Sequence, residues 1–366
     1  MVAALAPVTG RPLTADGVAT SRGDAVAVPA YRPRVPERSV AVLLNRNAQA
    51  VGPRVLAWFR TRLPPASLHV VATLDESRAA LARVLADGFG ALCVGGGDGS
   101  FQQVVADLIA LTPEPAPRPV LMPLRLGTGN AIADVAGASD GRAIGLARDL
   151  ARAASDEPGR ALGLLEVEGR ITHFTGVGLD ADWAGDYTWL IKQRLGRGRL
   201  LPLVRGLPGY LMTAFGLTLP RLLVRPRRPI RIVALADVRR LDLRGRTTAT
   251  IADGDVVHAG EVSVAAASTV VPYSAGLPFF PFADDLEGAF QLRASDLGLG
   301  GVLARLPRAR SGAFDDPKHV WDFAARAVRF EFAEPTQWHV GGDVQPPVTS
   351  LTVRSSPSTV QLLRRS

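Results

Sequence analysis

The sequence has a single cysteine, Cys93, among 366 residues. No disulfide can form within one chain, which is typical of a protein from a reducing compartment. Cys93 lies in an apolar run, so we expect it to pack in a core. The five histidines show none of the spacings of a zinc site. G-x-x-x-x-G-K-[ST] does not occur, which disfavours a Walker A nucleotide site.

Long hydrophobic runs are also absent. No stretch reaches the ~18 apolar residues of a membrane-spanning helix. The N-terminus has neither the charged nor the apolar region of a signal peptide, and residues 1–37 resemble a disordered leader. We therefore expect a cytoplasmic protein, and the length predicts two domains.

Acidic residues are missing from residues 192–231, which carry ten basic residues within a chain of net charge +8. The positive charge is therefore local, so no nucleic-acid partner is expected. Within this segment, residues 209–219 are apolar but too few to span a bilayer. We predict that 192–231 docks on an anionic membrane surface. The alternative is a helix that packs on the second domain and has a solvated basic rim.

What the chain does contain is a glycine-rich turn. Residues 90–94 predict a short buried strand, residues 95–100 read G-G-G-D-G-S, and apolar residues then recur at helical spacing over 101–111. A strand, a glycine turn and a helix let backbone N–H groups approach phosphate oxygens. Asp98 would repel phosphates there unless it holds a metal ion or a reacting hydroxyl. The alternative is a plain turn with a capping Asp. Ser100 is a candidate helix cap.

Strands and helices alternate over residues 38–160. This alternation predicts an α/β domain with a parallel, doubly wound (Rossmann-like) sheet. Ligands of such sheets bind at the carboxyl ends of the strands, and Asn45, Asp98 and Asn130 fall at such ends. Residues 161–350 contain short, partly alternating apolar runs separated by glycine or proline, which predict a mostly antiparallel β-sandwich domain. Helical interruptions are expected at 186–224 and 296–306.

Two glycine turns in this order resemble the diacylglycerol kinase catalytic family, which includes bacterial lipid kinases, sphingosine kinases and ceramide kinases. The family pattern is G-G-D-G-T, then G-T-G-N-D or G-S-G-N-A roughly thirty residues later. Here residues 96–100 read G-G-D-G-S and residues 127–131 read G-T-G-N-A. Weaker similarities lie at 174–181 (family F-n-x-x-G-x-D-A), 281–288 (family P-x-A…D-G) and 341–343 (G-G-D for D-G-E).

The resemblance implies ATP as the phosphoryl donor, Mg²⁺ as the metal and a lipid hydroxyl as the acceptor. It also implies that residues 351–366 return to the first domain. Asp98 and Asp343 are the implied catalytic residues, with Asp343 drawing the proton from the acceptor hydroxyl. Asp98 and Glu287 are the implied metal ligands. The implied nucleotide-binding residues are Asn45, Arg46, Gly95, Gly96, Gly97, Gly99, Ser100, Gly127, Thr128, Gly129 and Asn130.

Some positions depart from the family. The first turn, which begins at Asn45, lacks the family's glycine, so Arg46 would offer a guanidinium to the phosphates instead. The change from D-G-E to G-G-D removes one carboxylate and shortens the other. The sequence therefore predicts an ATP-dependent lipid kinase that visits the membrane peripherally. Two alternatives stay open, namely a catalytically weak nucleotide- or lipid-binding protein and an NAD kinase-like enzyme. The acceptor lipid is not specified, and a homodimer stays open.

Overall fold

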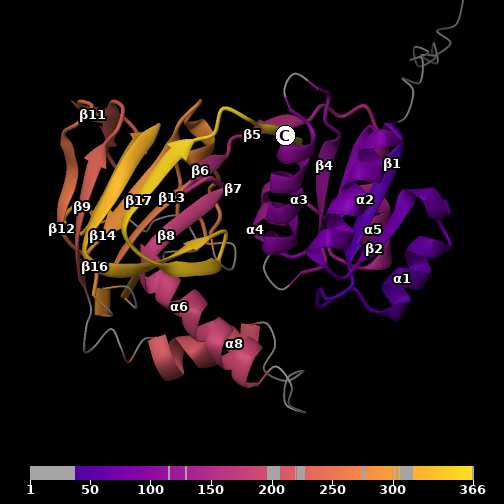
Figure 1. Cartoon of the computed structure of the whole chain (residues 1–366), viewed down its shortest axis with the longest axis horizontal. Helices are drawn as coiled ribbons and strands as arrows, with labels where there is room; N and C mark the ends of the chain where they lie inside the picture. The colour runs from indigo at the N-terminus through magenta and orange to yellow at the C-terminus, as the bar shows by residue number, and fades with distance from the viewer. Residues whose placement is uncertain are drawn as a thin grey trace, which may run out of the picture. The chain divides into compact units, whose positions relative to one another are not determined.

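The first part of the structure is a six-stranded sheet in the order β2-β1-β3-β4-β18-β5 (Figure 1). A computed structural model describes residues 38–113, 116–127, 130–195, 207–218, 220, 227–273, 277–298, 300–301, 304–305 and 316–364. The predicted leader, 1–37, lies outside these residues. The elements of the first part are β1 (Val40–Asn45), α1 (Pro53–Arg60), η1 (Pro65–Ser67), β2 (Leu68–Val71), α2 (Leu74–Ala86), β3 (Ala91–Gly96), α3 (Asp98–Leu111), β4 (Val120–Arg125), α4 (Ala131–Val135), α5 (Ala143–Ala154) and β5 (Arg160–Leu162).

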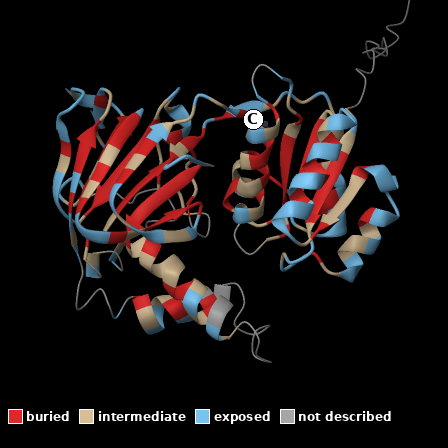
Figure 2. Ribbon diagram, in the orientation of Figure 1, coloured by how far each residue is buried: buried red, intermediate tan, exposed pale blue. Residues whose placement is uncertain are grey.

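Helices cover both faces of this sheet, as the predicted doubly wound arrangement requires. Successive strand residues point to opposite faces. Leu92 and Val94 pack with residues of α2 and α3 in one core, and Cys93 packs with residues of α1 and α5 in the other. All six residues of β3 are buried, which explains its unbroken apolar sequence. Figure 2 shows the buried strands between helices whose outer surfaces are exposed.

Local sequence signals set the ends of these helices. Helix α1 has Pro53 in its first turn, where the missing N–H has no helical partner to lose. Helix α2 follows Thr73, whose hydroxyl accepts a hydrogen bond from the Glu76 N–H at 3.2 Å. Asp75 and Glu76 place negative charge in the first turn of α2, which favours the positive end of the helix dipole.

The second part is a twelve-stranded sheet in which every pairing is antiparallel. Its strands are β6 (Leu165–Val167), β7 (Arg170–Thr172), β8 (Phe174–Gly178), β9 (Arg228–Ala234), β10 (Val238–Leu241), β11 (Thr247–Ile251), β12 (Val256–Val262), β13 (Val264–Ser268), β14 (Phe290–Ser295), β15 (Val320–Ala325), β16 (Ala327–Val340) and β17 (Asp343–Ser355). The short helix η5 (Ala283–Asp285) precedes β14.

Strand β16 folds this sheet over one large apolar core, and a smaller cluster around Phe174 and Tyr273 lies apart from it. Its first half pairs with β9 and its last three residues pair with β8, with register shifts between Glu331 and Trp338. Side chains from strands far apart in the sheet order, such as Ile232, Phe290 and Leu351, therefore meet in one apolar cluster. The predicted fold class, an α/β domain followed by a mostly antiparallel β domain, is confirmed.

The chain passes between the two sheets at both ends of the second one. Strand β5 joins the first sheet beside β18 (Val360–Leu362). The first sheet therefore extends past residue 160, where the first domain was expected to end. Strand β17 stays in the second sheet to Ser355, beyond the expected start of the returning segment at 351. Strand β18 pairs in parallel with β4. All these elements lie in one compact unit, Pro36–Ser366.

A helical excursion interrupts the second sheet between β8 and β9. It comprises α6 (Leu179–Tyr187), η2 (Thr188–Arg194), α8 (Leu207–Thr213) and η3 (Ala214–Thr218). The Trp183 indole donates to the Thr213 hydroxyl at 3.2 Å, and Thr218 donates to Asp186 at 2.8 Å. Residues 196–206, 219 and 221–226 of the predicted docking segment, and parts of 296–306, lie outside the described residues. None of the described helices is long and apolar enough to cross a membrane.

Candidate active site

The carboxyl ends of β1, β3 and β4 lie side by side at one edge of the first sheet. These strands are neighbours in the order β2-β1-β3-β4 and run parallel. The chain runs from β1 through α1 to β2 on one side, and then from β2 through α2 to β3 on the other side of β1, so the strand order reverses between β1 and β3. Doubly wound sheets bind ligands at such a reversal. Asn45, the glycine turn after β3 and the glycine turn after β4 are therefore brought together.

Close packing explains the glycines of the first turn. A Cβ atom on Gly95 would lie 2.3 Å from a Leu44 methyl carbon, and one on Gly96 would lie 2.5 Å from the Ser100 Cβ. None of the glycines at 95–99 has a positive φ. The turn therefore needs glycine for space rather than for an unusual backbone conformation. Gly97 directly precedes α3, whose N-terminal N–H groups point away from the helix.

The second turn contacts the first through the backbone. A Cβ on Gly127 would lie 2.2 Å from the Gly97 Cα. The Asn130 side chain closes the second turn, because its Oδ1 accepts from the Gly127 N–H at 3.1 Å and its Nδ2 donates to the Gly127 carbonyl at 3.0 Å. Thr128 and Gly129 lie outside the described residues. Asn130 therefore shapes the turn, a role that the sequence did not reveal.

Asp98 links the two turns. Its Oδ1 accepts a hydrogen bond from the Ile132 N–H at 3.1 Å, at the start of α4. Burial raises the pKa of the Asp98 carboxyl above its ordinary value, while hydrogen bonds from the Ile132 and Ala131 backbone lower it in part. The alternative of a capping Asp thus holds in part, although Asp98 caps α4 and not the helix that follows it.

Ser100 does not cap α3, so that prediction is wrong. The helix begins two residues earlier, at Asp98, and its N-cap Gly97 offers no side chain. The Ser100 hydroxyl instead accepts a hydrogen bond from Asn45 Nδ2 at 2.9 Å. Asn45 Oδ1 accepts from the Asn47 N–H at 2.9 Å, so Asn45 joins the end of β1 to α3. Arg46 is exposed beside it.

Asp343 reaches the glycine turn from the second sheet. It is exposed and begins β17, directly after the two-residue Gly341–Gly342 turn. Its Oδ2 lies 3.8 Å from the position that a Cβ on Gly99 would take. The two residues predicted to be catalytic therefore lie at the same turn, although 245 positions separate them in the chain.

Gln102 holds the Gly341–Gly342 turn against α3, and sequence reasoning missed it. The space for a Cβ on Gly341 is taken by the Gln102 side-chain oxygen. The same oxygen accepts from the Thr172 hydroxyl at 3.1 Å. Gln102 follows Asp98 by four positions and so lies on the same face of α3, but nothing in the sequence links that face to Gly341.

Glu287, the second predicted metal ligand, is exposed in the loop between η5 and β14. Among the described residues, no group of three or more His, Cys, Asp or Glu side chains could hold a metal ion. Mg²⁺ usually binds through one or two carboxylates together with substrate phosphates. Asp98 and Asp343 at one turn fit that kind of ligand set, and within the described part of the chain no contact links Glu287 to it.

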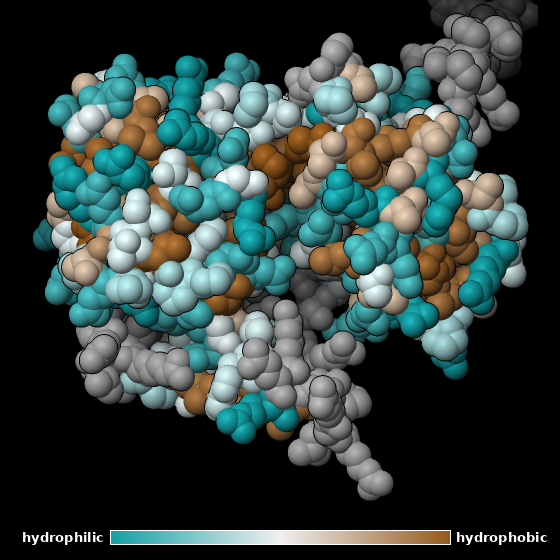
Figure 3. All heavy atoms as spheres, viewed as in Figure 1, coloured by the Kyte–Doolittle hydropathy of each residue, from teal (hydrophilic) through white to brown (hydrophobic). Residues whose placement is uncertain are grey.

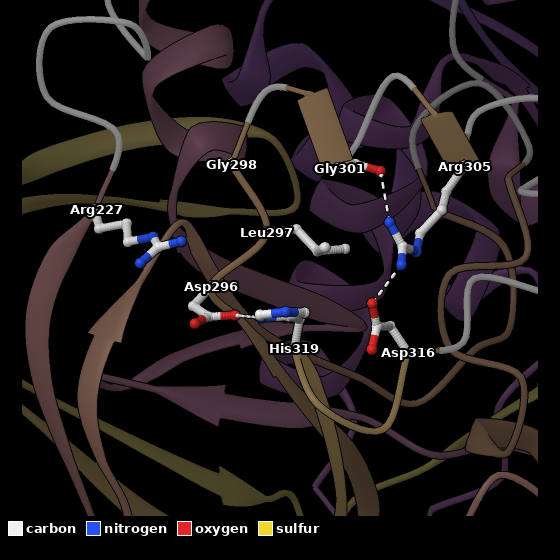
Figure 4. Close-up of a pocket in the computed structure, with 8 residues that line it drawn as sticks. All are labelled: Arg227, Asp296, Leu297, Gly298, Gly301, Arg305, Asp316 and His319. Atoms are coloured by element: carbon white, nitrogen blue, oxygen red, sulfur yellow. Dashed lines mark hydrogen bonds and ion pairs between the residues drawn. The ribbon is translucent and has the colours of Figure 1, made fainter.

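A pocket of about 270 Å³ lies elsewhere, beside β14 and β15 (Figure 4). His319 contacts Asp296 at 2.9 Å, and Arg305 pairs with Asp316. Charges of both signs therefore line the pocket, and they favour no ligand class. None of the predicted site residues is among its lining residues, which are Arg227, Asp296, Leu297, Gly298, Gly301, Arg305, Asp316 and His319.

Comparisons with known proteins bear on this site. Residues 39–157 match the family model of the diacylglycerol kinase catalytic domain. A provisionally assigned diacylglycerol kinase from Bacillus anthracis str. Sterne is similar in structure, with TM-score 0.59, 17% identity, and coverage of 91% of this chain and 99% of that one. A second diacylglycerol kinase structure from that strain gives TM-score 0.55, 15% identity, and coverage of 91% and 98%. At such low sequence identity, these structural similarities show only that the folds are alike. No curated protein matches the chain.

Proposed function

Because the chain belongs, through residues 39–157, to the diacylglycerol kinase catalytic domain family, we propose that it transfers the γ-phosphoryl group of ATP to the hydroxyl of a lipid. One observation supports the proposal most strongly. The Asp343 carboxylate, supplied by the second sheet, lies at the glycine turn of the first. A nucleotide-binding turn by itself is compatible with many kinds of protein. A carboxylate that a second domain places beside that turn is what transfer of a phosphoryl group to an acceptor hydroxyl requires.

The phosphates of ATP would bind over the two glycine turns. Gly96, Gly97 and Gly127 leave the backbone there free of side chains, and α3 begins at the same place. Backbone N–H groups and the positive end of the helix dipole would then face the phosphate oxygens. The exposed Arg46 at the end of β1 would add a positive charge.

Asp98 and Asp343 would hold Mg²⁺ together with the phosphates. A bound Mg²⁺ neutralises phosphate charge during transfer. Asp98 is fixed through its bond to the Ile132 N–H, so it offers a rigid ligand. Asp343 would accept the proton of the lipid hydroxyl as that oxygen attacks the γ-phosphorus.

The two alternatives make different predictions. A catalytically weak binding protein would bind ATP without turnover, and the single carboxylate of G-G-D is its motivation. An NAD kinase-like enzyme would phosphorylate a soluble dinucleotide and would need no apolar surface. The helical excursion carries such a surface and so favours a lipid.

We also propose that this excursion docks on an anionic membrane. Trp189, Leu211, Met212 and Phe215 expose 43%, 46%, 39% and 62% of their surfaces, and the guanidinium of Arg194 lies 5.3 Å from the Trp189 ring centre. Figure 3 shows part of this apolar surface in brown. Basic residues of 192–231 would complement anionic lipid, each contributing about 1 kcal/mol near such a surface, although Arg228 and Arg231 are paired with Asp182 and Glu331.

Vesicle co-sedimentation tests the docking. We expect binding to vesicles rich in phosphatidylglycerol, weaker binding at high salt, and a several-fold loss of binding in Phe215→Ser. The matched control is Leu243→Ser, because Leu243 is 49% exposed in another loop and should not affect binding. Equal binding to neutral and anionic vesicles, or equal loss in both variants, would contradict the proposal.

A phosphorylation assay tests the activity. Wild type, Asp98→Asn and Asp343→Asn are incubated with labelled ATP, Mg²⁺ and a panel of diacylglycerol, sphingoid and prenol lipids. Asp253→Asn, in an exposed turn of the second sheet, is the control for loss of a surface charge. We expect one lipid to be labelled by wild type and the control, and labelling to be nearly lost in the other two variants. No labelled lipid with wild type would favour the binding protein, and a labelled dinucleotide would favour the NAD kinase-like enzyme.

A further inference from the structure

Two buried side chains, Tyr273 and His339, meet the partly buried Asp180 behind the Gly341–Gly342 turn. The Tyr273 hydroxyl lies 2.5 Å from Asp180 Oδ2 and 2.9 Å from His339 Nε2, and His339 Nε2 lies 2.9 Å from the same Asp180 oxygen. Tyr273 and His339 are 8% and 1% exposed. Burial first, and then the Asp180 charge, raises the pKa of Tyr273 well above its ordinary value, so its hydroxyl remains a hydrogen-bond donor.

The hydrogen bonds assign the tautomer of His339. The Gly342 N–H donates to His339 Nδ1 at 3.2 Å, so Nδ1 must carry a lone pair. In a neutral imidazole the proton then lies on Nε2 and faces the Asp180 carboxylate. The Asp180 carboxylate thus fixes the ring, and the ring accepts a bond from the residue next to Asp343.

The surrounding chain is built to place Asp180 there. Gly176 lies directly opposite His339 in the sheet, and a Cβ on Gly176 would lie 2.2 Å from Asp180 Oδ2. Asp180 Oδ1 accepts from the Ala181 N–H at 2.8 Å, in the first turn of α6. The carboxylate therefore occupies the space that a side chain at Gly176 would fill. This packing explains why residue 176 is a glycine.

We infer that Asp180, acting through His339, is a positioning residue that holds the Gly342 N–H and thereby sets the place of the Asp343 carboxylate. The inference rests on the proposed function for the role of Asp343. The route is continuous, from Asp180 to His339 to Gly342, and Asp343 is the next residue in the chain. Gln102 contacts the same turn at Gly341 from the first sheet. The turn is thus held from both sheets.

Two substitutions of His339 separate positioning from stability. In His339→Asn the amide oxygen lies near the place of Nδ1 and can still accept the Gly342 N–H. In His339→Gln the amide nitrogen lies near the place of Nε2 and can still donate to Asp180. We expect kcat to fall roughly 10- to 100-fold in the Gln variant, as for the loss of other supporting hydrogen bonds. The Asn variant should lose clearly less, and KM for ATP should stay unchanged in both.

The chain offers a matched control in Asp322. Its carboxylate is also buried and lies in the same cross-strand row, Asp322, Arg293, Ala266, Gly176 and His339, so it faces the same side of the sheet. Its hydrogen bonds go to Arg293, at 2.7 and 2.8 Å, and to Gln291, at 2.6 Å, and not to the turn. Asp322→Asn should lower Tm while kcat per folded molecule stays unchanged.

The deciding experiment measures kcat and amide hydrogen exchange of residues 338–345 in full-length wild type, Asp180→Asn, His339→Asn, His339→Gln and Asp322→Asn. We expect faster exchange at Gly342 in the Gln variant than in the Asn variant and no change in Asp322→Asn. His339→Gln should add no further loss of kcat to Asp343→Asn. Unchanged exchange at Gly342 in the Gln variant, or equal loss of kcat in the Gln and Asp322 variants, would overturn the inference. If wild type labels no lipid, the proposed function fails, and the exchange result alone still decides whether His339 holds the turn.

Discussion

The glycine turn after β3 and the Gly341–Gly342 turn after β16 each bring an aspartate to the same place, but they need glycine for different reasons, and only Gly341 combines both, a positive φ and a Cβ position that Gln102 fills. Gly95, Gly96 and Gly127 have ordinary φ angles and are required by neighbours closer than 3 Å to a Cβ. Gly341 and Gly342 have φ of +56° and +88°, as a two-residue hairpin turn requires. The two aspartates differ as well, because Asp98 is tied to the α4 backbone and Asp343 is exposed.

This difference teaches that the first turn is a packed scaffold, whereas the second, although Gln102 and His339 hold it, has room for adjustment at Gly342. Substitutions of the glycines in the first should disturb the fold together with the site. Substitutions in the second should disturb the site more than the fold. The predictions below test that contrast from the largest expected effect to the smallest.

Asp343→Asn should have the largest effect on activity. A general base contributes roughly 10² to 10⁴-fold to a rate, so kcat should fall by about that factor. Tm should change little, because the side chain is exposed. Steady-state kinetics and thermal unfolding check this together. A loss of activity that merely follows a fall in Tm would count against a catalytic Asp343.

Gly127→Ala should have the largest effect on stability. Its Cβ would lie 2.2 Å from the Gly97 Cα and 2.8 Å from the Gly96 carbonyl oxygen, and backbone atoms cannot turn aside as a side chain can. We expect a loss of about 3 kcal/mol or more in the free energy of unfolding, together with loss of ATP binding. Urea unfolding and ATP titration measure the two effects.

Gly342→Ala should have a smaller effect on stability. An added Cβ would lie 4.0 Å from a Phe174 ring carbon, which is ordinary contact, so the cost is the left-handed backbone alone, about 1–2 kcal/mol. Activity should fall by more than stability suggests, because the turn carries Asp343. If Gly342→Ala destabilised the chain as much as Gly127→Ala, the contrast between a scaffold and an adjustable turn would fail.

Asp98→Asn should have the smallest effect on stability, and of opposite sign. The raised pKa of Asp98 means that its stabilising contribution is fully present below the unfolded-state pKa and is lost as pH rises through the folded-state pKa. Asparagine keeps an acceptor for the Ile132 N–H and carries no charge. The variant should therefore gain about 0.5–2 kcal/mol at pH 7 while losing activity.

Thermal unfolding as a function of pH checks this prediction. The gain of Asp98→Asn over wild type should shrink as pH falls below the raised pKa of Asp98 and vanish once the wild-type carboxyl is protonated in both states. A variant that is less stable than wild type at pH 7 would show that the Asp98 charge stabilises the fold.

The spacing of apolar residues, with glycine and proline between the runs, predicted the alternation of strands and helices in the first sheet and the antiparallel second sheet. Such local patterns report which faces are buried. Pairings between distant segments were less accessible. That β5 and β18 extend the first sheet depends on contacts across some 200 positions. The start of α3 at Asp98 was mispredicted because the capping partner of Asp98, the Ile132 N–H, lies 34 residues away.

The candidate site shows the same limit. The glycine turns could be found from sequence because both their spacing and their residue types are distinctive. Gln102 and His339 could not, since a glutamine in a helix and a histidine in a strand are ordinary. Their importance arises only where Gly341 and Gly342 fold against them.

The central claim is that Asp98 and Asp343 serve one site. The most direct test measures kcat/KM of Asp98→Asn, Asp343→Asn and the double variant, with the lipid that the wild type phosphorylates as substrate. Residues that act as a unit lose activity non-additively. We predict that the double variant is no less active than the weaker single variant. A double variant whose loss equals the product of the two single losses would show that the aspartates act independently and would contradict the account.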